Sequence, residues 1–147
     1  MSEFDFEPLS RPASTLRYVV CGASGRVGRS VAERLLSQGH SVRAVTRDAG
    51  RVSDLAERGA DIRVGSPQDA EFLAGVMDGA DAAFVLTPVD VLQPDVNAEQ
   101  ARVVRGTLEA IRRSGLRHVV LLSSWGAELA EPVGGVIATH WFEQGLD

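Results

Sequence analysis

The sequence contains no lysine, a single cysteine and a single tyrosine. The lone Cys21 excludes an internal disulfide framework and is typical of a protein in a reducing compartment. Because the 15 residues of the lysine and arginine class are all arginine, no side-chain amine is available to form a Schiff base or to carry a proton. No apolar run approaches the ~18 residues that a membrane helix needs.

The composition is that of an acidic globular protein. It has 147 residues, 44% of them hydrophobic and 24% charged, which is enough for one domain with a core. The net charge of −5 argues against a general nucleic-acid binder. The N-terminal MSEFDFE is acidic and lacks the basic and apolar regions of a secretory signal. We therefore expect a cytoplasmic protein whose partners include neither nucleic acid nor a membrane.

Residues 1–15 are predicted to form an N-terminal extension, because Pro8 and Pro12 interrupt any helix. Two readings stay open for it: disorder, or a short strand that covers a sheet edge. From residue 16 to 147, strand-like and helix-like segments alternate. The predicted strands are 16–21, 41–46, 61–64, 80–86 and 118–123, and the predicted helices are 25–38, 53–58, 68–77, 95–114 and 137–144.

This strict alternation predicts an α/β domain with a doubly wound parallel sheet. Right-handed crossovers favour a Rossmann-like strand order of 3-2-1-4-5. Residues 119–122, Val-Val-Leu-Leu, are apolar at every position, so this strand is predicted to be covered on both faces.

Three glycines follow the first predicted strand, with the spacing G-x-x-G-x-x-G: Gly22, Gly25 and Gly28. Glycine lets the backbone bend sharply and come close to a phosphate. The following helix would offer unpaired N–H groups and the positive end of its dipole. Since the motif lies between a strand and an amphipathic helix, it predicts a dinucleotide site, with a plain strand-to-helix turn as the alternative.

The end of the second predicted strand indicates which dinucleotide is bound. NAD-selective folds usually have a carboxylate there, whereas a positive residue suits the 2′-phosphate of NADP. Arg47 occupies this place, and Arg26 in the glycine turn is positioned to reach the same phosphate. The alternative is that both are solvated arginines, with Asp48 paired to either. We predict NADP as the cofactor, with NAD as the alternative.

Four segments resemble the NmrA-like group of atypical short-chain dehydrogenase/reductases, a family of NAD(P)-binding Rossmann proteins. They are VVCGASGRVG (19–28), VRAVTR (42–47), GADAAFV (79–85) and HVVLLSSWGA (118–127), and the resemblance covers residues 16–147. It implies that the domain binds the cofactor through Gly22, Ser24, Gly25, Arg26, Val27, Gly28, Arg47, Thr87 and Pro88. It also implies that Ser123 and Ser124 lie near the nicotinamide, and that His140 belongs to a helix beginning near the active site.

The chain departs from this family in two ways. Many relatives move a proton with a tyrosine and a lysine four residues apart, but here the only tyrosine is Tyr18, in the first predicted strand. Family members usually continue with further strands and a small substrate-binding region, whereas this chain stops at Asp147. We therefore expect the usual C-terminal substrate region to be missing. Whether the short C-terminus is natural or marks a cut chain stays open.

The remaining candidates have plainer interpretations. Cys21 is expected to be a small buried residue rather than a nucleophile. His140 and Glu143 are spaced i, i+3, which predicts a helix-surface hydrogen bond, with acid–base catalysis as the alternative. The three histidines, His40, His118 and His140, are too scattered to indicate a metal site.

Two functions follow from these patterns. The first is an NAD(P)-dependent oxidoreductase that transfers hydride between the nicotinamide and a small quinone or carbonyl substrate, with Ser123, Ser124 or His140 polarising or protonating it. The second is a non-catalytic NAD(P)-sensing regulatory protein acting through a protein partner. If the usual sixth strand is missing, the fifth strand is an exposed apolar edge, which predicts a homodimer.

Overall fold

The computed structural model describes residues 14–129, 131 and 134–147 and contains one parallel five-stranded sheet. Its strand order is β3-β2-β1-β4-β5, which confirms the predicted Rossmann-like α/β class and order. The strands are β1 (Arg17–Val20), β2 (Ser41–Thr46), β3 (Asp61–Val64), β4 (Ala82–Val85) and β5 (Val119–Leu121). The predicted extension, residues 1–15, lies outside the described residues except for its last two positions.

The helices lie between the strands as the alternation predicts. They are α1 (Arg26–Ser37), α2 (Ser53–Glu57), α3 (Ala70–Met77), α4 (Val96–Ser114) and α5 (Val136–Leu146). Side chains fix the beginnings of two of them, because Asp69 accepts from the Phe72 amide at α3 and Asp95 from the Ala98 amide at α4. Gly115 ends α4 in the left-handed conformation, with φ of 67°. No helix within the described ranges is long and apolar enough to cross a membrane.

A short 3-10 helix, η1 (Ala49–Val52), lies between β2 and α2 and was not predicted. The Asp48 carboxylate starts it by accepting from the Gly50 amide. Since the chain is already turning when it reaches α2, Ser53 has helical backbone angles, and the N-cap is Val52, with no side-chain bond. Ser53, the first residue of the predicted helix 53–58, therefore does not cap α2.

The two faces of the sheet carry separate apolar clusters. Against one face, α3, α4 and α5 bury a cluster whose largest members include Leu73, Met77, Val85, Val104 and Phe142. Against the other face, α1, η1 and α2 bury a cluster that includes Val20, Ala32, Val42, Val52 and Leu55. This burial on both faces makes the sheet doubly wound and fixes the carboxyl ends of its strands along one edge.

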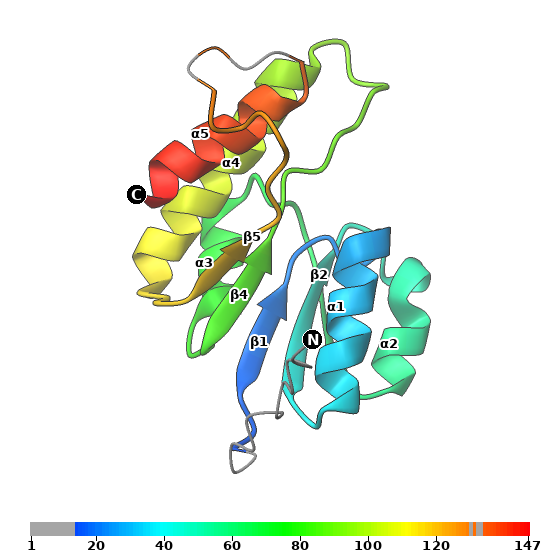
Figure 1. Cartoon of the computed structure of the whole chain (residues 1–147). Coiled ribbons are helices and arrows are strands. Elements are labelled where there is room, and N and C mark those ends of the chain that lie inside the picture. The colour runs from blue at the N-terminus through cyan, green and yellow to red at the C-terminus, as the bar shows by residue number, and fades with distance from the viewer. Residues whose placement is uncertain (1–13, 130, 132–133) are drawn as a thin grey trace, which may run out of the picture.

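The outer strand β5 is covered on one face only. Val119 and Leu121 pack against the α3–α4–α5 cluster, whereas Val120 is 61% exposed and Leu122 is 40% exposed. Figure 1 shows the reason: α1 and α2 lie beside β1 and β2, and no helix crosses the near face of β4 and β5. The prediction that this strand is covered on both faces is therefore wrong within the described part of the chain.

Candidate nucleotide-binding site

The glycine turn between β1 and α1 is shaped by close backbone contacts. Gly22 has φ of +66°, in the left-handed region that favours glycine, and its carbonyl oxygen accepts from the Gly25 amide at 2.9 Å. A Cβ atom at Gly28 would lie 2.2 Å from the same carbonyl oxygen. The turn therefore has no room for a side chain at Gly28, and it brings α1 directly against the end of β1.

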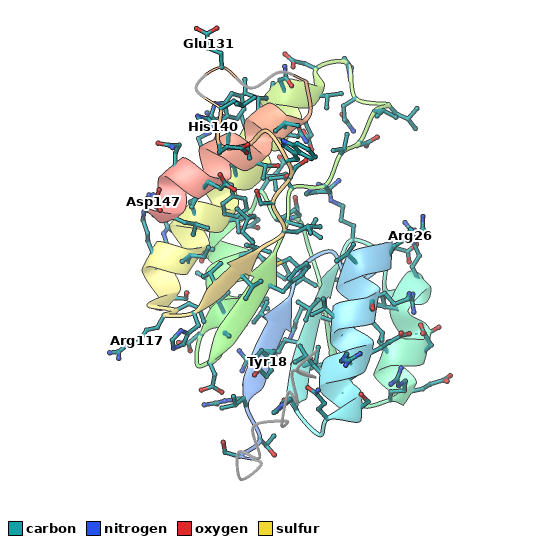
Figure 2. All side chains as sticks on the ribbon, viewed as in Figure 1. Tyr18, Arg26, Arg117, Glu131, His140 and Asp147 are labelled. Carbon is teal, nitrogen blue, oxygen red and sulfur yellow. The ribbon has the colours of Figure 1, made fainter. Side chains whose placement is uncertain are left out.

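The first turn of α1 has no side-chain cap, unlike the first turns of α3 and α4. Gly25 is the N-cap residue, and no acidic side chain lies in the first turn. The unpaired amides at this end suit an anion such as a pyrophosphate. Arg26 and Val27 are exposed here, and Figure 2 shows Arg26 at the end of α1, on the side away from β5.

A hollow of about 180 Å³ extends from the glycine turn to the end of β2. Four of the predicted cofactor-binding residues line it, namely Gly22, Ser24, Arg47 and Pro88. Gly25, Arg26, Val27 and Gly28 do not line it but form the adjoining turn and first helical residues. The predicted residues thus gather at the carboxyl ends of β1, β2 and β4.

Arg47 lies between this hollow and the loop that follows β4. Its Nη2 atom is 3.8 Å from Oε1 of Glu99, and half of its side chain is exposed. The pKa of the nearby Asp90 carboxyl is lowered, mainly by a hydrogen bond from the Gln93 amide and then by the Leu92 N–H, with a smaller contribution from the Arg47 charge. A partly exposed guanidinium beside such weak, distant partners stays available to a phosphate.

Arg51 of η1 lines the same hollow and was not among the predicted site residues. Its carbonyl oxygen accepts from Arg29 of α1, whose guanidinium also pairs with Asp54 of α2. The Asp48 carboxylate is engaged with the Gly50 amide at 2.9 Å and forms no ion pair among the described residues. The signal that would have revealed Arg51 is the Asp-x-Gly pattern, which begins a local turn.

A second hollow, of about 320 Å³, lies at the carboxyl ends of β4 and β5. The predicted Thr87, Ser123 and Ser124 line it, together with Thr139 of α5. Leu86, the residue after β4, lines both hollows. The two hollows are therefore neighbours at the place where the strand order reverses between β1 and β4, which is the usual place for a ligand of an open α/β sheet.

The predicted His140–Glu143 surface bond is not formed in the described structure. Instead Ser123 Oγ donates to Glu143 Oε1, and His140 Nδ1 lies 2.6 Å from the carbonyl oxygen of Ala127. Both α5 side chains thus reach back to the segment after β5 rather than to each other. His140 does not line the second hollow, although Figure 2 shows it on the side of α5 near this loop.

Cys21 is 5% exposed at the floor of the first hollow, and burial raises the pKa of its thiol to about 12. This confirms the expectation of a buried residue and disfavours the thiolate that a nucleophile requires. Within the described ranges, no three His, Cys, Asp or Glu side chains are grouped to hold a metal ion.

A parallel sheet whose order reverses beside a glycine turn, an uncapped helix and two neighbouring hollows define a dinucleotide-binding protein of the Rossmann class. The chain belongs to the NAD(P)H-binding family, whose model matches residues 22–147. The predicted binding of an NAD(P) cofactor is thereby confirmed at the level of the family.

Curated relatives and solved structures agree with this assignment. The chain is 29% identical over 115 residues to an NAD(P)H azoreductase of Xenophilus azovorans, covering 78% of this chain and 38% of the relative. It is 31% identical over 140 residues to sterol demethylase protein B of Methylococcus capsulatus, covering 88% and 42%. An NADPH-dependent quinone oxidoreductase of Escherichia coli, solved with NADPH, shares the fold with a TM-score of 0.72 at 21% identity, over 89% of this chain and 44% of that one. The chain thus spans less than half the length of these proteins.

Proposed function

We propose that this chain forms the cofactor-binding part of an NADPH-dependent reductase that delivers hydride to a small quinone or carbonyl acceptor. The observation that carries the proposal is that two hollows, one beside the arginines and one beside the serines, both have Leu86 in their lining. The azoreductase and quinone oxidoreductase names of the similar proteins support a reductase. When bound, the dihydronicotinamide ring supplies the hydride.

Each part of the nucleotide has residues suited to it. The turn formed by Gly22, Ser24, Gly25, Arg26, Val27 and Gly28 would hold the pyrophosphate through its amides, and the backbone crowding at Gly28 is the close approach that such a site requires. Arg47 and Arg51 would hold the adenosine 2′-phosphate. Thr87 and Pro88 would contact the cofactor where β4 ends, on the way to the second hollow.

The preference for NADP over NAD rests on the end of β2. Arg47 and Arg51 line the hollow there together with Asp48, the carboxylate of this strand end, whose Oδ1 accepts from the Gly50 amide. Quenching of protein fluorescence measures both affinities, and we expect NADPH to bind at least about tenfold more tightly than NADH. The double variant Arg47→Ala/Arg51→Ala should remove the difference. Equal affinities in the unchanged protein would contradict the preference.

We assign the acceptor contact to Ser123 and Ser124 rather than to His140, because both serines line the second hollow and His140 does not. The experiment is anaerobic mixing of the protein with NADPH and a panel of quinones and carbonyl compounds. The expected result is loss of the NADPH absorbance with at least one acceptor. If NADPH binds and its absorbance never falls, the reductase proposal is wrong.

A second candidate is an NAD(P)-sensing protein without turnover. It is favoured by the composition, since the chain has no lysine and its one tyrosine, Tyr18, lies in β1. It predicts a protein partner whose affinity differs between NADP- and NADPH-loaded forms. An affinity that is the same in both forms would count against it.

We further propose that the protein forms a homodimer through β5. The exposed Val120 and Leu122 support this, because proteins rarely leave an apolar edge strand bare. A second copy would cover this edge and would border the second hollow, which Leu122 also lines.

A further inference from the structure

We propose that Ser123 and Glu143 form a proton-relay pair at the acceptor end of the site, with Ser123 contacting the acceptor and Glu143 acting through Ser123. This inference rests on the proposed reductase function and deepens it. Ser123 was expected near the nicotinamide, whereas the role of Glu143 follows only from its contact in the structure.

The two residues are brought together by the fold from 20 positions apart in sequence. Ser123 follows the end of β5 by two residues and lines the second hollow. Glu143 lies on α5, is half-buried and does not line the hollow. The hydroxyl that faces the hollow thus has a carboxyl group directly behind it.

This contact distinguishes Ser123 from the other hydroxyls of the hollow. Thr87, Ser124 and Thr139 also line it, but among the described residues none of them bonds to a titratable side chain. The phenol of Tyr18 is remote, on β1 and next to His40, with 5.2 Å between the ring centroids. Among the described residues, Ser123 is therefore the hydroxyl of the second hollow that contacts a carboxyl side chain, and that side chain is Glu143.

No charged group forms an ion pair with Glu143 in the described part of the chain. On α5, His140 is directed to a loop carbonyl, and Asp147 lies one turn further on. From α4, Arg112 donates to a carbonyl oxygen near the end of α5, and in the loop Glu128 accepts from a backbone amide. None of these groups forms an ion pair with Glu143 within the described residues.

Reduction of a carbonyl acceptor at this pair would combine hydride transfer with proton transfer through Ser123 and Glu143. The acceptor carbon gains the hydride with its electron pair, the C=O π bond opens, and the acceptor oxygen takes the Ser123 hydroxyl proton. In the structure Ser123 Oγ donates to Glu143, which is the polarity of the oxidation direction. For reduction the hydroxyl turns its proton to the acceptor, the Ser123 oxygen accepts the proton of the protonated Glu143 carboxyl, and water then returns a proton to Glu143. The acceptor would thus gain one hydride, supplied by NADPH when bound, and one proton, supplied through Ser123. Alcohol oxidation runs the same proton path backwards, with the carboxylate as the base.

The first test compares Glu143→Gln with the unchanged full chain, using NADPH and an acceptor from the panel. The amide keeps a hydrogen-bond acceptor for Ser123 but has no acidic proton. We expect kcat for reduction to fall about 100-fold, with KM and NADPH affinity little changed. The pH profiles of kcat for the two proteins should differ, because the amide cannot exchange a proton. The matched control is Glu109→Gln, which removes an exposed carboxylate paired with Arg113 on α4.

A second readout needs no turnover. The ¹³C chemical shift of the Glu143 carboxyl, measured without nucleotide, should change in Ser123→Ala and stay unchanged in Ser124→Ala. Thermal unfolding shows whether each variant is folded. When Glu143→Gln is added to a folded Ser123→Ala variant, activity should fall little further than in Ser123→Ala alone.

The outcomes separate the two proposals. Turnover that is unaffected by Glu143→Gln, with the same pH profile, overturns the relay and leaves the reductase proposal standing. The relay is also overturned if the ¹³C chemical shift of the Glu143 carboxyl is the same in Ser123→Ala as in the unchanged protein. NADPH binding without turnover in the unchanged protein overturns the reductase proposal, and the relay fails with it. A loss of kcat confined to Glu143→Gln and Ser123→Ala, with a changed pH profile, supports the pair.

Discussion

Gln100 is fully buried in α4, and within the described part of the chain neither polar atom of its side chain has a hydrogen-bond partner. Leaving a buried amide unpaired costs about 1–3 kcal/mol. We predict that Gln100→Met, which keeps the length of the side chain, raises the free energy of unfolding by about 1 kcal/mol, measured by urea denaturation. Gln38→Met, at the exposed C-cap of α1, is the control and should change stability by less than about 0.5 kcal/mol. A loss of stability in Gln100→Met would contradict the prediction.

The buried thiol of Cys21 should make stability depend on pH in the alkaline range. Burial raises its pKa from 9.0 to about 12, so above pH 9.0 the unfolded chain releases a proton that the native protein holds. The free energy of unfolding should therefore fall with rising pH between these values and be unaffected by this group below them. Urea denaturation across this interval should give a smaller decline for Cys21→Ala than for the unchanged protein. Parallel pH profiles for the two proteins would be inconsistent with the shift.

At the scale of elements, the turn between β1 and α1 offers the sharpest test. In Gly28→Ala the new Cβ would lie 2.2 Å from the Gly22 carbonyl oxygen, a backbone atom, so the turn must shift. We expect NADPH affinity, measured by fluorescence quenching, to weaken by about tenfold or more, which corresponds to about 1.4 kcal/mol. Gly75→Ala on α3 is the control, because nothing lies within 4 Å of its new Cβ. It should leave affinity unchanged and stabilise the helix by about 0.5–1 kcal/mol.

The sequence predicted elements well where local chemistry decides them. β2 and β3 have the predicted bounds, and Asp95 begins α4 as expected, because alternation and capping act within a few residues. η1 was missed, since a 3-10 turn leaves no hydrophobic period, and Arg51 was missed with it.

The candidate site could be predicted only in part, for a related reason. Helical spacing places His140 and Glu143 on one face of α5, but it does not reveal what that face meets. The contacts of these residues with the segment after β5 are tertiary, so they appear only when the strand and helix are placed together. The residues of the glycine turn and Arg47 were accessible from sequence because strand ends and turns carry recognisable residue types.

At the scale of the whole molecule, the uncovered face of β5 makes association testable. We predict a dimer by light scattering at micromolar concentration, and we expect Val120→Glu to shift it to monomer, because a charge would be buried in the contact. Val64→Glu is the matched control, since Val64 is 54% exposed on β3, at the opposite edge of the sheet. A monodisperse monomer of the unchanged protein would refute the dimer, and an equal effect of the two variants would refute the proposed contact.

The side chain of Leu86 affects both ends of the site. Its side chain borders both hollows, and its methyl groups would lie 3.1–3.2 Å from a Cβ built at Gly22. A substitution at this one position alters the room for the nucleotide and the room for its reaction partner together. A variant that gains a new acceptor through a substitution at Leu86 would therefore also change its affinity for the cofactor. Substitutions at Arg47 or Arg51 would change cofactor affinity alone. Substitutions at Ser123 or Ser124 would change the choice of acceptor alone.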